Sequence, residues 1–341
     1  MELLKRLSEA HGIAGNEGEV RAIMEAELKA SCQVEVDALG NLIARKGSGE
    51  RKIMLAAHMD EIGLMVKYID KNGFIKFATI GGFFDQTLLN QRVLIHTSKG
   101  QVCGVIGSKP PHLMKDEEKK KVVEYRDMFI DVGAKSAETA KALGVGLGDC
   151  ITFDRSFREL SGGLVTGKAF DDRIACYILV QVMREVEAEA TVYAVGTTQE
   201  EVGFKGARTA SYRINPDLAI ALDVTTAGDY PGIKEEESSL KVGQGPAITL
   251  VDASGRGLIT HPKVKEMLIA TAERHKIPYQ LEVGEGGTTD ATGIHITREG
   301  IPSGVVSVPT RYIHTPVEVA SMEDIRNTVK LVRLALEECR W

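Results

Sequence analysis

Two adjacent carboxylates, Glu200 and Glu201, follow a short apolar stretch at residues 191–196. The stretch is β-branched and closes on a glycine, which is typical of a buried strand. Two charges at the end of such a strand cost free energy unless they have partners or a chemical task. Taken alone, the pair is more simply explained as part of a solvated loop, so other residues must decide its role.

Further residues of metal-binding type follow other predicted strands or open a predicted helix: His58, Asp60, Asp171, Asp223 and His314. In an open, mainly parallel sheet, functional sites form in the crevice beyond the carboxyl ends of the strands. Each residue alone has a simpler explanation, because a single histidine is more often a satisfied core or surface residue. An aspartate before a helix is more often an N-cap, and this remains the expectation for Asp172. Imidazoles and carboxylates together at one sheet edge, however, are the composition of a zinc or related divalent site.

The number of candidate ligands indicates two metal ions. The five candidates are His58, Asp171, Glu201, Asp223 and His314. If one carboxylate bridges, each ion has three protein ligands and keeps an open position for water, as in two-metal hydrolytic sites. Glu200 is then free to accept a proton from that water and pass it to a leaving amine. Asp60, two residues after His58 on an extended chain, points the same way and can orient the imidazole.

The predicted elements would position these residues on one sheet. Strand and helix patterns alternate over residues 1–61 and again over 160–341, which predicts an α/β domain with a mixed, mainly parallel sheet sandwiched by helices. Residues 62–159 instead read as antiparallel hairpins, one of them at Asn72-Gly73, and predict an inserted small β-rich domain. Within it, the charged segment 109–121 is expected to be a solvated loop, with a gate over a site as the lesser alternative.

Composition excludes several classes of function. A formal net charge of −6 argues against a nucleic-acid partner. No apolar run approaches the eighteen residues of a membrane span, and the N-terminus does not resemble a signal peptide. The five cysteines are scattered, which predicts reduced thiols in a cytoplasmic protein and gives no support to a cysteine nucleophile.

Five short segments, in this order, resemble the TET aminopeptidases, also described as deblocking or glutamyl aminopeptidases. They are HMDEIG at 58–63, DDR at 171–173, EEVG at 200–203, ALDV at 221–224 and RYIHTP at 311–316. The resemblance runs nearly end to end and includes the inserted domain. It implies a zinc-peptidase type of fold and a dinuclear metal-dependent aminopeptidase that acts on short peptides. Some members of this family have been labelled endoglucanases.

The same resemblance implies roles for individual residues. Asp171 would bridge the two metals, with His58 and Asp223 completing one site and Glu201 and His314 the other. Glu200 would be the general base, Asp60 would support His58, and the Asp171–Asp172 peptide bond would be cis.

The resemblance also implies partners and cofactors. The activating ions would be zinc or cobalt, and the same ligands suit manganese. The inserted domain would mediate dimerisation, and dimers would assemble into a hollow homododecamer. The expected substrate-binding residues lie in the glycine-rich loop at Gly287, Thr288 and Asp290. The residue preferred at the substrate N-terminus depends on pocket walls that the sequence does not locate.

Two other functions are compatible with parts of the pattern. A glycoside hydrolase could use Glu200 and Glu201, but its carboxylates must face each other across a sugar about 5–10 Å apart, and it has no need of two histidines. A non-catalytic relative of the same fold would be expected to have lost ligands, and this sequence has lost none.

Overall fold

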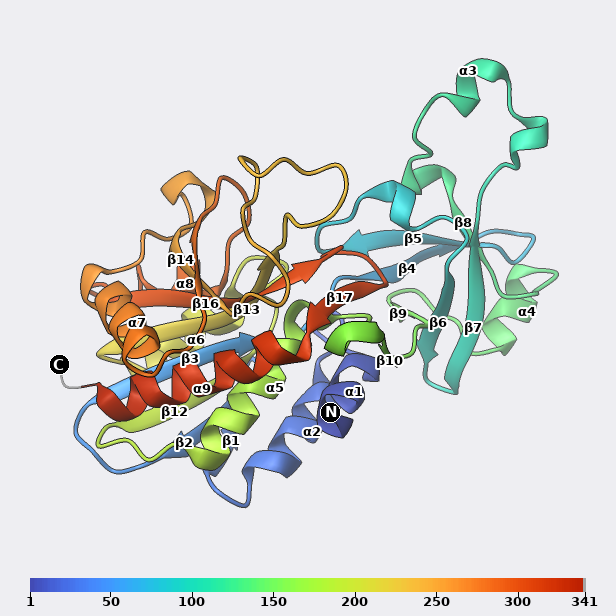
Figure 1. Ribbon diagram of the computed structural model, residues 1–341. Helices are drawn as coiled ribbons and strands as arrows, with labels where there is room; N and C mark the ends of the chain where they lie inside the picture. The colour runs from blue at the N-terminus through green and yellow to red at the C-terminus, as the bar shows by residue number, and fades with distance from the viewer. Residues whose placement is uncertain (340–341) are drawn as a thin grey trace.

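The computed structural model describes residues 1–339 as a large α/β body that carries a small β-barrel at one end (Figure 1). The strands are β1 Gln33–Val36, β2 Leu42–Lys46, β3 Lys52–His58, β4 Gly63–Ile69, β5 Ile75–Ile80, β6 Arg92–Thr97, β7 Gly100–Gly107, β8 Phe129–Asp131, β9 Cys150–Phe153, β10 Arg158–Glu159, β11 Leu164–Gly167, β12 Thr191–Thr197, β13 Leu218–Thr226, β14 Ala247–Val251, β15 Gln280–Val283, β16 Ser303–Arg311 and β17 Glu318–Ser321. The helices are α1 Glu2–Glu9, α2 Gly18–Leu28, α3 Asp116–Lys119, α4 Ala137–Ala142, α5 Phe170–Glu185, α6 Lys205–Ile214, α7 Pro262–Arg274, α8 Asp290–Ile294 and α9 Met322–Glu338.

The large sheet has the strand order β1-β2-β12-β3-β13-β16-β17-β11-β10, with β14 and β15 attached beside β16. Its four central strands, β12, β3, β13 and β16, run parallel, while β1, β2, β17, β11 and β10 pair antiparallel towards the edges. The carboxyl ends of the four central strands therefore meet at one edge of the sheet. This confirms the predicted α/β class and the mixed sheet.

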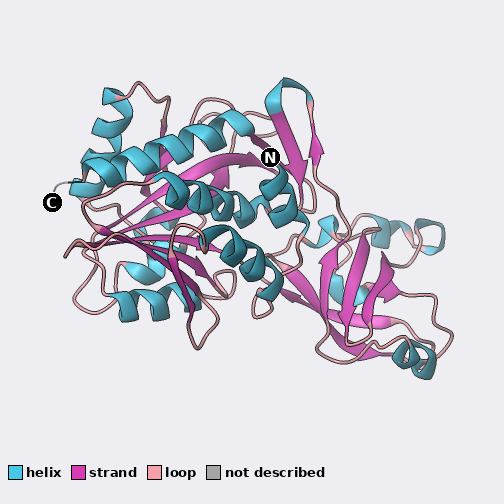
Figure 2. Cartoon of the chain, turned by 90° about the horizontal axis from the view of Figure 1, so that it is seen from below, coloured by secondary structure: helices cyan, strands magenta, loops and turns pink. Residues whose placement is uncertain are grey.

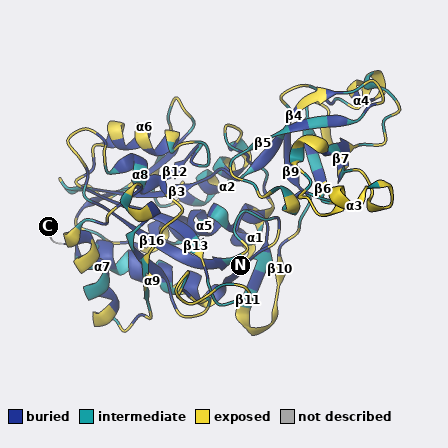
Figure 3. Ribbon diagram, turned by 90° about the horizontal axis from the view of Figure 1, so that it is seen from above, coloured by how far each residue is buried: buried dark blue, intermediate teal, exposed yellow. Residues whose placement is uncertain are grey.

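Helices cover both faces of this sheet because its strands alternate their side chains (Figure 2). On β3, Ile53, Leu55 and Ala57 point to one face and join the core formed with α1, α2, α5, α7 and α9. Met54 and Ala56 point to the other face and pack with α6 and α8. Because both faces are covered, the central strands are apolar on both sides, which Figure 3 shows as buried ribbon.

The inserted segment forms a closed barrel of strands β4-β5-β8-β7-β6-β9. The Asn72-Gly73 turn joins β4 to β5 as predicted, with Gly73 at a φ of +93° that favours glycine. The barrel has its own apolar core, separate from that of the large body, which includes Leu64, Ile75 and Ile151. The predicted β-rich insertion is therefore confirmed. The charged α3 lies exposed at the outer end of the barrel, remote from the large sheet (Figures 1 and 3).

One strand end differs from its prediction. Asp223 does not end its strand, because β13 stays paired with β16 through Thr226. The pairing with a neighbouring strand therefore extends β13 beyond its apolar run. At the C-terminal helix, Ser321 is the N-cap of α9, and the carboxylate of Asp324 accepts the backbone N–H groups of Gly243 and Gly245.

A buried ionic network joins α5 to the N-terminal segment. The guanidinium of Arg173, which is fully buried, donates to the carbonyls of Leu7, Ala10 and Met59 and to Glu61 Oε1 at 3.0 Å. Lys168 Nζ donates to the other oxygen of Glu61 at 2.7 Å. Among the described residues, no helix is long and apolar enough to cross a membrane.

We predict that Arg173→Met destabilises the protein by about 3–5 kcal/mol, because it removes one of the two cations that pair with the buried Glu61 and takes the guanidinium donors away from several buried carbonyls. Arg184→Met on the same helix is the matched control. Its side chain is 40% exposed and pairs with Glu27 on the surface, so its loss should cost less than about 1 kcal/mol. Urea unfolding of both variants measures the difference, and equal stabilities would contradict the structural role of Arg173.

Candidate active site

The predicted site residues converge at the carboxyl edge of the parallel strands. His58 ends β3, Asp223 lies near the end of β13, and Glu200 and Glu201 follow β12 within three and four residues. His314 follows β16, and Asp171 lies at the start of α5. All of these side chains line one cavity of about 740 Å³: His58, Asp171, Glu200, Glu201, Asp223 and His314.

Asp171 lies between the two imidazoles. His58 Nε2 is 3.0 Å from Asp171 Oδ1, and His314 Nε2 is 3.3 Å from Asp171 Oδ2. His314 Nε2 is also 3.5 Å from Glu201 Oε1. The two oxygens of one carboxylate thus face two separate groups of donors, which is the arrangement that a bridging ligand needs.

Asp172 does not act as the helix cap that its position suggests. Its side chain is buried, Oδ2 accepts the backbone N–H of His58 at 3.1 Å, and Oδ1 has no hydrogen-bond partner among the described residues. Neither Asp171 nor Asp172 has helical dihedral angles, so Asp172 is not placed as a helix cap. The peptide bond between them is cis, as the family resemblance implies.

Two groups of ligand atoms are close enough to hold a metal ion. One consists of His58, Asp171 and Glu201, and the other of His58, Asp172 and Asp223, with all ligand atoms of each group within 4.8 Å of one another.

Burial and mutual repulsion make these carboxylates hard to ionise. The pKa of Asp223 is raised well above its usual value, first by burial and then by the charge of Asp171. Burial also raises the pKa of Glu200, and the charges of Asp290, Asp223 and Glu201 add to the shift. Burial, with the charge of Asp171, raises the pKa of Glu201 to about 7.

The same carboxylates raise the pKa values of the two histidines, His58 and His314. Burial alone would lower their pKa values, yet the carboxylates Glu200 and Asp171 raise the pKa of His58 well above its usual range. The hydrogen bond with Asp171 raises the pKa of His314 to about 10 in the same way. The cluster therefore attracts positive charge, and no lysine or arginine of the described chain lines the cavity. Clustered carboxylates and imidazoles without such a counter-charge fit divalent cations.

Asp60 positions two parts of the site rather than one. His58 Nδ1 lies 3.1 Å from the Asp60 carbonyl oxygen and 3.6 Å from its Oδ1. The carboxylate itself accepts the backbone N–H groups of Glu200 at 2.9 Å and of Glu201 at 3.1 Å. Asp60 thus joins the end of β3 to the segment after β12.

Sequence reasoning missed Glu318. This buried residue of β17 accepts the backbone N–H of Asp171 through Oε2 and that of His314 through Oε1, both at 3.1 Å. The sequence could have indicated Glu318 only by its position, four residues after His314 and directly before the apolar residues 319–320.

The three residues expected to bind substrate are separated by the structure. Gly287 and Thr288 line the cavity. Asp290 does not, because it begins α8, where it is buried and accepts the hydroxyl of Thr197. Its charge instead acts on Glu200 from behind the cavity wall.

Comparison with known proteins agrees with this geometry. A family model described as M42 glutamyl aminopeptidase matches residues 40–331. The lysyl aminopeptidase of Pyrococcus furiosus is 37% identical over 344 residues, covering 99% of this chain and 97% of that protein.

Several solved structures are also similar to this chain over almost its whole length. The aminopeptidase APDkam598 from Desulfurococcus kamchatkensis has a TM-score of 0.96 and 44% identity, covering 99% of this chain and 94% of that one. The TET1 peptidase of Pyrococcus horikoshii, described as assembling into a tetrahedron or a large octahedral shell, has a TM-score of 0.89 and 35% identity, with 99% of both chains covered. A Thermotoga maritima protein described as an endoglucanase has a TM-score of 0.81 and 33% identity, covering 98% and 96%. The chain therefore belongs to the M42 glutamyl aminopeptidase family and is a metal-dependent aminopeptidase.

Proposed function

We propose that this chain is a dinuclear metallo-aminopeptidase that releases N-terminal residues from short peptides. The observation that carries the proposal is the position of Asp171 between His58 and His314, one carboxylate oxygen towards each imidazole. Asp171 would bridge two divalent ions. His58 and Asp223 would complete one site, and Glu201 and His314 the other.

Zinc or cobalt is the proposed metal, and manganese suits the same ligands. When bound, the two ions would lower the pKa of a water molecule and polarise the carbonyl of the peptide bond that is cleaved. Glu318 and Asp60 would keep the ligands in place, because their carboxylates bind the backbone of the ligand-bearing segments.

Glu200 is the proposed general base. Its Oε1 is buried without a hydrogen-bond partner among the described residues, and its Oε2 is 3.9 Å from His58 Nε2. A carboxylate at this position can take a proton from the attacking water and deliver it to the leaving amine. Because Asp60 holds its backbone N–H, Glu200 would keep this position during the reaction.

A glycosidase function has weaker support. Both backbone amides of Glu200 and Glu201 are held by the single carboxylate of Asp60, so the two residues share one side of the cavity. A pair of glycosidase carboxylates has to face each other across the sugar. A non-catalytic relative would be expected to lack some of the proposed metal ligands. All of them are present in this chain, so a non-catalytic function has no support.

Residues 1–61 and 160–341 form the proposed catalytic domain, and residues 62–159 form the inserted domain. The barrel of this insertion is the proposed dimerisation domain. Its surface exposes several large apolar side chains, including Tyr68, Phe84 and Leu147, as interfaces commonly do. Dimers formed in this way would build a tetrahedral homododecamer, as the TET1 peptidase forms a tetrahedron. We also propose a cytoplasmic location, which free thiols at all five cysteines support.

We predict that Glu200→Gln lowers kcat on aminoacyl-p-nitroanilides by about 100- to 10,000-fold, the usual contribution of a general base. Metal content should stay at the wild-type level, because Glu200 is not a proposed ligand. Elemental analysis of the purified variant provides this control. Near-wild-type turnover would refute the role of Glu200.

Metal removal should reduce both activity and stability. A chelator would leave the buried carboxylates to repel one another in full, so the Tm should fall. Metal ions added back at 100 times their Kd should raise the free energy of unfolding by about 2.7 kcal/mol. Asp171→Asn is the control, because its Tm should respond little to added zinc or cobalt. Hydrolysis of cellulose-type substrates that survives chelation would instead favour the glycosidase.

The assembly can be tested by light scattering after gel filtration. Tyr68→Asp combined with Leu147→Asp places two charges on the barrel and should give particles smaller than the wild type. Tyr212→Asp is the matched control, because Tyr212 is equally exposed, at 60% against 59% for Tyr68, but lies on α6 of the large body. A double variant of unchanged mass would argue against assembly through this surface of the barrel.

A further inference from the structure

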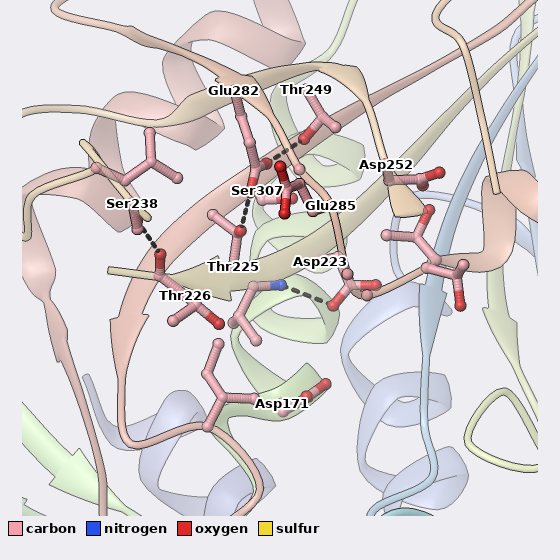
Figure 4. Close-up of a pocket in the computed structure, with 18 of the residues that line it drawn as sticks. Asp171, Asp223, Thr225, Thr226, Ser238, Thr249, Asp252, Glu282, Glu285 and Ser307 are labelled. Atoms are coloured by element: carbon pink, nitrogen blue, oxygen red, sulfur yellow. Dashed lines mark hydrogen bonds between the residues drawn. The ribbon is translucent and has the colours of Figure 1, made fainter. Parts of the chain in front are cut away.

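The cavity extends from the candidate metal ligands to a wall formed by β13, β14, β15 and the glycine-rich loop (Figure 4). This wall is acidic, because the cavity lining contains six carboxylates besides the proposed ligands and base: Glu235, Glu236, Glu237, Asp252, Glu282 and Glu285. Three of them lie on an exposed loop, where Glu235 and Glu236 pair with nearby lysines. These solvated groups form no specific site, in contrast to the more buried Glu282 and Asp252.

Glu282 is held in place by neutral groups. Its Oε1 accepts the hydroxyl of Thr225 at 2.5 Å, and its Oε2 accepts the hydroxyl of Thr249 at 2.7 Å. Figure 4 shows these three side chains together on the cavity wall. Two hydroxyl donors orient the carboxylate but leave its negative charge without a cation.

Asp252 is a second carboxylate in need of a partner. It is only 5% exposed, one of its oxygens accepts the backbone N–H of Leu258, and Oδ2 has no hydrogen-bond partner among the described residues. Burial, with the nearby charge of Glu282, raises the pKa of Asp252 to about 6. A buried carboxylate oxygen without a partner is costly, and a bound cation would remove that cost.

The distance from the catalytic cluster fits a substrate side chain. Thr225 lies two residues beyond Asp223 on β13, so both side chains face the cavity, about 7 Å apart along the strand. Glu282 accepts the hydroxyl of Thr225, so it lies farther along the cavity than the proposed ligand Asp223, and the offset of Thr225 itself is about the length of a lysine side chain. At this position Glu282 is too far from the reacting centre to bind the α-amino group of the substrate's N-terminal residue. It is placed to bind the end of that residue's side chain.

We propose that the cavity selects peptides whose N-terminal residue is lysine or arginine, with Glu282 and Asp252 as the counter-charges for its side chain. This assignment rests on the proposed aminopeptidase function and names its substrate class. An N-terminal glutamate would meet the same two carboxylates and be rejected by like charge.

The test compares substrates of equal shape that differ in charge. The metal-loaded enzyme is assayed with aminoacyl-p-nitroanilides of lysine and norleucine, and of arginine and citrulline, with glutamate as the opposite charge. A charged hydrogen bond in a partly buried site predicts about 10- to 100-fold higher kcat/KM for each cationic member. Equal values for lysine and norleucine, or a preference for glutamate, would overturn the assignment.

Variants of Glu282 and Asp252 test whether these two residues cause the preference for cationic substrates. Glu282→Gln should lower kcat/KM for lysine by about 10- to 100-fold and leave norleucine unchanged. Asp252→Asn should act in the same direction and carries the test if Glu282→Gln does not fold, which its Tm would reveal. Glu299→Gln removes the same charge from an exposed turn outside the cavity and serves as the control.

The outcomes separate this assignment from the proposed function. Equal losses for lysine and norleucine in a folded Glu282→Gln variant would mean that Glu282 supports the site as a whole, and would overturn its role in specificity. Activity that favours norleucine or leucine would refute the cationic substrate class while leaving the aminopeptidase intact. Inactivity of the metal-loaded wild type on every substrate would instead refute the proposed function, and this assignment with it.

Discussion

The repulsion between buried carboxylates at one edge of the sheet is the constraint on which this structure depends. Asp171, Glu200, Glu201 and Asp223 share a cavity with two imidazoles, and no lysine or arginine of the described chain lines it. Burial and like charge raise the pKa of Asp223, Glu200 and Glu201. A divalent cation offsets such repulsion more fully than protonation of the neighbouring imidazoles can. The family's metal dependence is thus already visible in the electrostatics of the protein alone.

A fold that concentrates this charge has to hold it rigidly, and two buried carboxylates do so from outside the ligand set. Asp60 binds the backbone amides of Glu200 and Glu201, and Glu318 binds those of Asp171 and His314. Each joins two segments that are far apart in the sequence. Hydrogen bonds to a charged acceptor are strong and directional, so they fix these loops at the sheet edge.

The same cavity separates chemistry from recognition along one strand. Asp223 near the end of β13 belongs to the proposed metal site, whereas Thr225 two residues later orients Glu282 on the cavity wall formed with β14 and β15. Strand alternation makes both side chains face the cavity. A single strand therefore sets the spacing between the reacting centre and the proposed substrate side-chain pocket.

Apolar periodicity and turn signals are local, so they were enough to predict the α/β class, the inserted β-rich segment and the residues that gather at the strand ends. His58 and Glu201 were predictable in this way from the strands that precede them. The contacts of Asp172, the second role of Asp60, the role of Glu318 and the position of Glu282 were decided only by tertiary structure. Each depends on a hydrogen bond between strands or segments remote in the sequence, and no local pattern encodes which distant backbone a buried carboxylate will meet.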